Sequence, residues 1–330
     1  MWPMCFLVNE NNDQRFLIAT KNMSCPTQPR DTLYPMSTNM AGLQLLEPTE
    51  LYNILNRSPG KPYLSNPNYL LLLDVRQSSD YAESHVLLAK NIHPNKQGLY
   101  STPYDAELEC KEFVIVYDSK TKSLEDEGEA VKCASTLWQK GSRNSVKVLK
   151  GGYEVFSALY PFLREQKILY MPRELDEIKT YPLEIIPGFL YLGNWRQGNA
   201  AYIQKDLKIK AHINCCVESE SFFREEGACL MHIQVEDDKE ADIQSKFRSA
   251  CDFLDDHRTI GTVVLVFSKL GISRSVSIVT AYLMHHYKMS FKEATTKVRQ
   301  CCPNAKPNAG FLRQLMNWGK EVMEHTDEML

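Results

Sequence analysis

The sequence lacks long apolar runs, cysteines in C-x-x-C spacing and a strong charge bias. No apolar stretch reaches the roughly 20 residues that a membrane-spanning helix needs. The ten cysteines include no C-x-x-C pair and mostly lie in apolar runs, so we expect buried thiols in a reducing compartment and no metal site. A net charge of −3 excludes the broad basic field that would attract nucleic acid or an anionic membrane.

Residues 1–40 lack a regular hydrophobic period and are predicted to form an irregular extension. The segment that begins at Met1 has no basic n-region and no clear cleavage site, which argues against a secretory signal. Acidic residues are sparse here, whereas Arg15, Lys21 and Arg30 are present. We therefore expect a cytoplasmic protein, with mitochondrial import as the alternative.

Residues 41–162 alternate between strand-like and helix-like patterns. The apolar runs at 69–76, 113–117 and 146–149 are typical of buried strands, and residues 130–140 have the pattern of a helix. This alternation predicts a parallel α/β sheet. Residues 163–181 are charged and contain few large apolar residues, so they are predicted to form a linker to a second domain at 182–325, with a tail at 326–330.

The first of these domains resembles the rhodanese fold, and in particular the rhodanese-like domain at the front of MAP kinase phosphatases. The matching residues are Leu73-Asp74-Val75-Arg76, Tyr81, His85, Ala89, Ile92 and Leu149-Lys150-Gly151-Gly152. In rhodaneses the loop after the second strand starts with a sulfur-carrying cysteine, and the matching position here is Asp118. A carboxylate cannot carry a persulfide, so the resemblance implies no sulfur transfer.

Two further expectations concern charged residues of this domain. We expect Asp74 and Arg76 to form an internal ion pair that fixes the fold. The related phosphatases use an arginine cluster here to dock MAP kinases, but the segment after Ile92 offers only Lys96 and Lys111. The sequence therefore argues against MAP kinase docking.

The stretch at 263–275 joins a β-branched run to a short loop with one glycine and then to an apolar helix. A loop between a strand and a helix N-terminus directs backbone N–H groups and the positive end of the helix dipole at one point, which favours an anion. Arg274 adds a planar fork of donors suited to phosphate. The predicted phosphate-binding residues are Ser268, Lys269, Leu270, Gly271, Ile272, Ser273 and Arg274.

The second domain resembles the dual-specificity protein phosphatases. Their signature is His, Cys, two variable residues, Gly, two more residues, Arg, and then Ser or Thr. The same frame here holds Phe267, Ser268, Gly271, Arg274 and Ser275. The resemblance further matches Asp237 to the general acid of the family, and Asn308-Ala309-Gly310-Phe311 to another family landmark. The expected fold class is a rhodanese-like parallel-sheet domain followed by a dual-specificity, cysteine-type phosphatase-like α/β domain.

The exchange of cysteine for Ser268 removes the nucleophile that this family uses. A cysteine can attack phosphorus because its pKa, about 8.5 when free, falls well below 7 at a helix N-terminus. A serine hydroxyl starts far higher, and Phe267 supplies no base beside it. We therefore expect no useful phosphatase turnover, and the pattern resembles the STYX pseudophosphatases.

The rest of the loop can still bind phosphate. The expected partners are therefore proteins, namely phosphoproteins, active phosphatases or other signalling proteins. No cofactor is expected. Two alternatives stay open. In the first, the protein is a scaffold that does not use the pocket, and Arg274 is bonded to loop carbonyls or to Asp237. In the second, Ser268 supports weak phosphatase activity.

Overall fold

The computed structural model of the chain describes residues 42–57, 63–102, 107–169, 172–217 and 229–327. These residues fall within one compact unit, Met40–Leu330. The extension predicted at residues 1–40 lies outside the described residues. Helix α11 continues to Asp327, so the first two residues of the predicted C-terminal tail are helical and the last three are not described.

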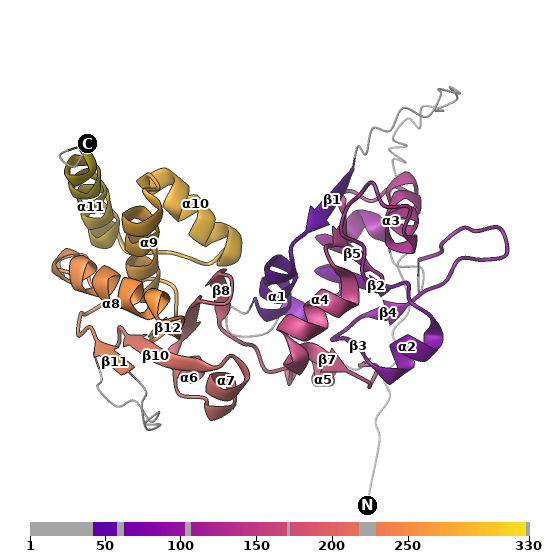
Figure 1. The fold of residues 1–330 in the computed structure, drawn as a ribbon, viewed down its shortest axis with the longest axis horizontal. Coiled ribbons are helices and arrows are strands. Elements are labelled where there is room, and N and C mark those ends of the chain that lie inside the picture. Colours follow the sequence, from indigo (N-terminus) through magenta and orange to yellow (C-terminus); the bar gives the residue numbers. More distant parts are fainter. Residues whose placement is uncertain (1–41, 58–62, 103–106, 170–171, 218–228, 328–330) are drawn as a thin grey trace, which may run out of the picture. The chain divides into compact units, whose positions relative to one another are not determined.

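A five-stranded sheet forms the centre of the first domain (Figure 1). Its order is β1-β6-β5-β2-β4, and every neighbouring pair is parallel. The predicted strands are present because their β-branched and leucine-rich runs are buried on both faces, as a parallel sheet requires. The strands are β1 (Leu43–Leu46), β2 (Leu70–Asp74), β4 (Lys90–Asn91), β5 (Phe113–Tyr117) and β6 (Val146–Leu149).

The described residues of this domain form α-helices that flank the sheet in sequence. Helix α1 begins with a capping box, in which Glu47 and Glu50 each bond the other's backbone N–H, and Pro48 occupies its first turn. The predicted helix at 130–140 appears one residue earlier, as α3. The helices are α1 (Pro48–Asn56), α2 (Ser78–Glu83), α3 (Glu129–Gln139) and α4 (Gly152–Leu159).

The segment predicted as a linker contains secondary structure of its own. Strand β7 (Arg164–Glu165) pairs antiparallel with β3 (His85–Val86), and α5 (Pro172–Asp176) follows. Tyr181 is buried, and its N–H donates to the Asn56 Oδ1 at 2.8 Å. Through these contacts the segment packs against the first domain. Its charged composition did not predict this packing.

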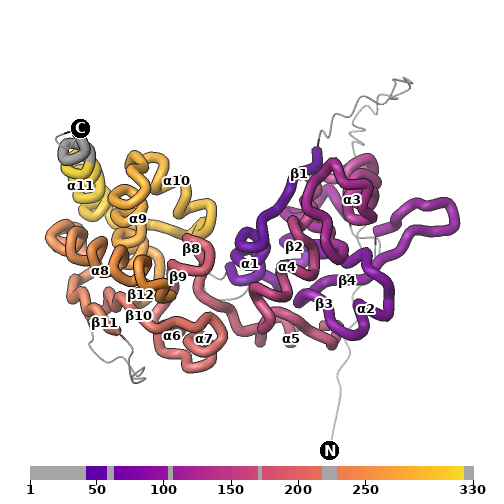
Figure 2. Tube along the Cα trace, in the orientation of Figure 1, coloured from indigo at the N-terminus to yellow at the C-terminus, as the bar shows by residue number. Residues whose placement is uncertain are grey.

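A second five-stranded sheet forms the centre of the other domain, in the order β11-β10-β12-β9-β8. Only β8 and β9 are antiparallel. Strand β12 pairs on both sides, and the tube in Figure 2 leads from it directly into α9. The strands are β8 (Leu183–Ile186), β9 (Leu190–Asn194), β10 (Ile209–Asn214), β11 (Cys229–His232) and β12 (Val263–Ser268).

Helix α9 is the central helix of this domain, and residues 274–284 are all buried. It packs against α8, α10 and α11, which accounts for the burial of these residues. The helices are α6 (Trp195–Gly198), α7 (Ala201–Asp206), α8 (Phe247–Thr259), α9 (Arg274–Tyr287), α10 (Phe291–Cys301) and α11 (Ala309–Asp327).

Candidate functional site

The loop between β12 and α9 lies against the end of strand β9. Ser268 is the last residue of β12 and Arg274 is the first residue of α9. Gly271 has a φ of +74°, and a Cβ there would lie 2.7 Å from the carbonyl oxygen of Gly193. Only glycine combines this backbone conformation with so close a contact, so the tight loop depends on it.

The hydroxyl of Ser268 is enclosed by this loop. The residue is 2% exposed, and its Oγ lies 2.9 Å from the Oγ of Ser275. It also accepts a hydrogen bond from the Gly271 N–H at 3.3 Å. Neither partner is a base, so nothing within hydrogen-bonding distance among the described residues would take the proton of Ser268.

Arg274 is only 6% exposed, and its side chain extends toward the segment after β11. Its Nη1 donates to the Val235 carbonyl oxygen at 3.2 Å, and its Nε lies 3.8 Å from Oδ2 of Asp237. That buried Nε makes no hydrogen bond with any described residue. A buried donor without a partner is costly, and a phosphoryl oxygen would satisfy it.

Asp237, the residue matched to a general acid, contacts the loop through its carboxylate. Its Oδ1 accepts hydrogen bonds from the Ser273 Oγ at 2.6 Å and the Asn308 Nδ2 at 3.0 Å. The contribution of Asn308 was not predicted, although it opens the stretch recognised as a family landmark. Gly310 in that stretch allows it to lie close to the segment after Asp237, because a Cβ at position 310 would lie 1.8 Å from the Lys239 carbonyl oxygen.

The middle of the loop faces solvent. Leu270 is 70% exposed and Lys269 is also exposed, whereas Ile272 is partly buried. The Ile272 carbonyl accepts a hydrogen bond from the Lys306 N–H at 2.8 Å. The structure therefore places Ser268, Ser273 and Arg274 in the interior of the predicted phosphate site and Lys269 and Leu270 at its outer rim.

Phe267 occupies the signature position of histidine as a core residue. It is 1% exposed and packs so closely on Gly198 that a Cβ there would lie 2.7 Å from its ring. The ring of His212 meets it edge-on, with 6.2 Å between centroids. Burial lowers the pKa of His212 to about 4, so this imidazole is neutral at pH 7. The imidazole beside Phe267 is thus uncharged.

The carboxylate of Asp118, in the other domain, bonds its own loop. Its Oδ1 accepts from the backbone N–H groups of Lys120 at 3.0 Å and Thr121 at 2.8 Å. Its Oδ2 accepts from the Thr121 hydroxyl at 2.5 Å. The side chain at the position matched to the sulfur-carrying cysteine therefore accepts hydrogen bonds from donors of its own loop.

The predicted pair of Asp74 and Arg76 is confirmed. The Arg76 Nη2 and Asp74 Oδ2 are 2.6 Å apart, and both side chains are buried. The guanidinium also stacks on Tyr153, with its Cζ 3.7 Å from the ring centroid. This pair stabilises the fold around β2.

Three other features bear on cofactors, membranes and thiol chemistry. Over the described ranges, no cluster of three His, Cys, Asp or Glu residues could hold a metal ion. In the same ranges no helix is both long and apolar enough to span a membrane. Of the described cysteines, the exposed ones are Cys110 and Cys229, and the buried ones are Cys133, Cys215, Cys216, Cys251, Cys301 and Cys302.

Comparison with known proteins matches both domains. Residues 190–321 match the family described as dual specificity phosphatase, catalytic domain, and residues 48–159 match the rhodanese-like domain family. These matches confirm the predicted fold class.

Individual relatives show how far the similarity extends. Human "Dual specificity protein phosphatase 1" is 29% identical over 291 residues, which are 77% of this chain and 79% of that protein. Human "Dual specificity protein phosphatase 5" is 33% identical over 210 residues, 55% of this chain and 52% of that protein. The crystal structure of human DUSP28 is 28% identical, with a TM-score of 0.40, and covers 42% of this chain and 93% of that one.

Proposed function

We propose that this chain, in which a rhodanese-like domain is followed by a dual specificity phosphatase-like domain, is a catalytically inactive phosphatase relative of the STYX-like kind. It regulates signalling by binding phosphoproteins, active phosphatases or other signalling proteins. Its phosphate-binding loop, residues 268–274, forms the binding site, and no step of turnover takes place there.

The observation that carries the absence of turnover is the environment of Ser268. Its hydroxyl contacts only the Ser275 hydroxyl and the Gly271 N–H among the described residues. An alcohol needs a base to become a nucleophile at neutral pH, because a helix dipole alone does not ionise it. Asp237 does not serve, since its carboxylate accepts from Ser273 and Asn308.

Phosphate binding is supported by Arg274 and by the uncharged Ser268. The buried Nε of Arg274 has no hydrogen-bond partner among the described residues, although the guanidinium is already oriented by the Val235 carbonyl. A neutral hydroxyl in place of a thiolate removes the repulsion that a phosphate dianion would meet. The loop can therefore hold a phosphoryl group without cleaving it.

A second candidate function is a scaffold that leaves this site empty. Its support is the contact of Arg274 with the Val235 carbonyl and, at 3.8 Å, with Asp237. These internal groups compete with any phosphate for the same guanidinium. The two candidates differ in whether partner binding depends on Arg274.

A phosphatase assay on a phosphotyrosine peptide tests the missing nucleophile. The native chain should show no turnover above buffer, and turnover abolished by Ser268→Ala would contradict the proposal. The double change Phe267→His with Ser268→Cys should create activity, because Gly271, Arg274 and Asp237 remain in place. Ser268→Cys alone is the matched control and should give less, since it lacks the histidine of the family signature.

A binding experiment tests the role of Arg274. We expect Arg274→Ala to weaken binding of a phosphotyrosine peptide about 10- to 100-fold, because a buried charge-assisted hydrogen bond contributes about 1.5–3 kcal/mol. Arg274→Lys should also weaken it, since lysine lacks the planar fork. Arg299→Ala, at an exposed position of α10, is the control. Unchanged binding in both Arg274 variants would favour the scaffold.

A further inference from the structure

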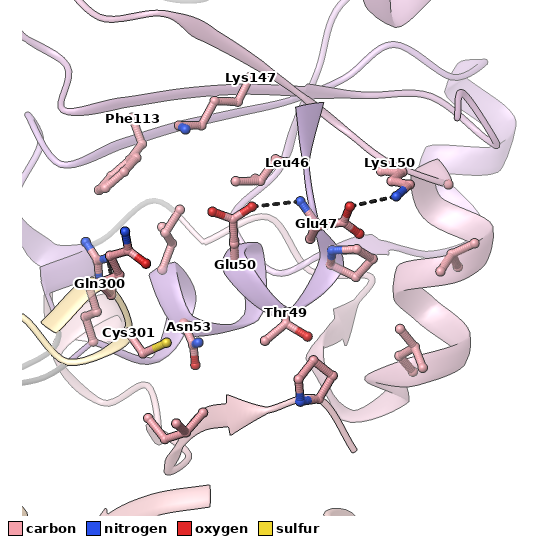
Figure 3. Close-up of a pocket in the computed structure, with 18 of the residues that line it drawn as sticks. Leu46, Glu47, Thr49, Glu50, Asn53, Phe113, Lys147, Lys150, Gln300 and Cys301 are labelled. Carbon is pink, nitrogen blue, oxygen red and sulfur yellow. Dashed lines mark hydrogen bonds and ion pairs between the residues drawn. The ribbon is translucent and has the colours of Figure 1, made fainter. Parts of the chain in front are cut away.

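A cavity of about 770 Å³ lies apart from the phosphate-binding loop and shares no lining residue with it (Figure 3). Its walls come from α1, the C-terminal end of β6, α4, β8 and α10. We call it the α1–α10 pocket. In Figure 3, Lys147 and Lys150 lie along one rim, and Gln300 and Cys301 lie on the opposite side.

The rim of the α1–α10 pocket is rich in cations, although the whole chain has a net charge of −3. Two carboxylates also line it. Glu47 is neutralised by Lys150, with 2.7 Å between Oε1 and Nζ. Glu50 accepts the Glu47 N–H at the N-terminus of α1, where the helix dipole stabilises its charge. The cationic lining residues are Arg57, Lys122, Lys147, Lys150 and Lys297.

Three of these cations have no carboxylate within ion-pair distance in the described part of the chain. They are Lys122, Lys147 and Lys297, and the Nζ of Lys147 donates only to the neutral Gln44 Oε1, at 3.1 Å. The Nε of Arg57 is in addition buried without a hydrogen-bond partner among the same residues. Like charges that line one cavity repel each other, and an anion placed among them would relieve that repulsion.

The interior of the α1–α10 pocket is mostly apolar. Val155 and Leu159 lie four residues apart on one face of α4 and are 37% and 55% exposed. Ile54 and Ile185 line the pocket from α1 and β8. An apolar chain laid on this wall would cover side chains that water now contacts.

The floor of the pocket is held in place by paired hydrogen bonds. The Asn53 Nδ2 donates to the Glu184 carbonyl at 2.8 Å, and the Glu184 N–H donates to the Asn53 Oδ1 at 2.8 Å. The Arg57 Nη2 donates to the Gln300 carbonyl at 2.9 Å, which ties α1 to α10. A ligand would therefore bind a largely formed site, and little conformational entropy would be lost in ordering the protein.

We propose that the α1–α10 pocket binds a free amphipathic anion, an alkyl or aryl chain that ends in a carboxylate or a phosphate. The chain lies on the apolar wall of α4, and the anionic end lies at the cationic rim of the pocket. The volume falls within the roughly 300–1,000 Å³ typical of sites for small molecules, which favours such a molecule over a peptide.

The test is calorimetric titration of the full chain with decanoate below its micelle concentration, because a carboxylate probe does not target the phosphate-binding loop. One saturable site is expected, whereas acetate and decyltrimethylammonium should not bind detectably. The double change Lys147→Gln with Lys297→Gln should weaken binding about tenfold, as two lost charged contacts would. Leu159→Ser should weaken it as well, because it removes part of the apolar wall.

Matched controls separate this site from general charge effects and from the phosphate-binding loop. Lys205→Gln with Lys246→Gln removes two exposed charges elsewhere and should leave the dissociation constant within about twofold. Arg274→Ala should likewise change nothing. The proposal is overturned by the absence of saturable binding, by equal weakening in both lysine pairs, or by a loss seen only with Arg274→Ala. It is equally overturned if an acidic peptide or phosphatidate vesicles bind the pocket while monomeric decanoate does not.

Discussion

Replacement of Gly271 by alanine tests whether the loop lies against β9 as described. The backbone there has a φ of +74°, and the new Cβ would lie 2.7 Å from the Gly193 carbonyl oxygen and 3.1 Å from the Asn194 nitrogen. Both neighbours are backbone atoms of β9, so no side chain can rotate away. The loop itself must move, and Ser268 and Arg274 move with it.

The expected decrease in the free energy of unfolding has two parts. A left-handed conformation costs a residue with a Cβ about 1–2 kcal/mol, and forcing a methyl group into a packed site costs about 1–3 kcal/mol more. Gly188 provides the control, because its φ is +66° and, apart from its two chain neighbours, no described residue would lie within 4 Å of the added methyl group. Gly188→Ala should therefore cost only the first part, about 1–2 kcal/mol.

Urea denaturation of the two variants and the native chain measures this difference in the free energy of unfolding. Gly271→Ala should lose about 1–3 kcal/mol more than Gly188→Ala, and it should also bind a phosphotyrosine peptide more weakly. Equal losses in the two variants, with peptide binding unaffected, would refute the described contact between the loop and β9.

Two further predictions concern buried polar groups. Arg76→Lys should reduce the free energy of unfolding by about 1–3 kcal/mol, because lysine cannot make the forked bonds to Asp74 or stack on Tyr153. The exposed Arg164→Lys is its control. Because burial lowers the pKa of His212 to about 4, the unfolded chain takes up a proton there below about pH 6.5 while the folded chain does not until about pH 4. The contribution of His212 to the free energy of unfolding is thus complete above about pH 6.5 and is lost as the pH falls. Between pH 7 and pH 5 the native chain should therefore lose about 2 kcal/mol more stability than His212→Gln.

Each of these two predictions is contradicted by a different result. A loss for Arg76→Lys no larger than for Arg164→Lys, in thermal or urea unfolding, would show that the buried pair contributes little. Parallel stability-against-pH curves for the native chain and His212→Gln would show that His212 titrates normally in the folded state.

The sequence predicted most of the structure that consecutive residues form. The β-branched run at 263–268 and the apolar helix after it are consecutive, so the strand, loop and helix of the candidate site followed from local pattern. The ion pair of Asp74 and Arg76 was also predictable, because the two opposite charges lie two residues apart at the end of a predicted strand. The linker was less predictable, since the pairing of β7 with β3 joins residues about 80 positions apart and has no local signature.

The sequence by itself determined which residue types occupy the candidate site. Ser268 stands where the phosphatases that this chain resembles have a cysteine, and a carboxylate at position 118 cannot carry a persulfide. Only the tertiary structure decided what those residues contact. It brought Asn308 to Asp237, closed the Asp118 carboxylate onto its own loop, and gathered lysines of both domains around the α1–α10 pocket. The first and the last of these join distant segments, so they depend on how the two sheets and their helices pack.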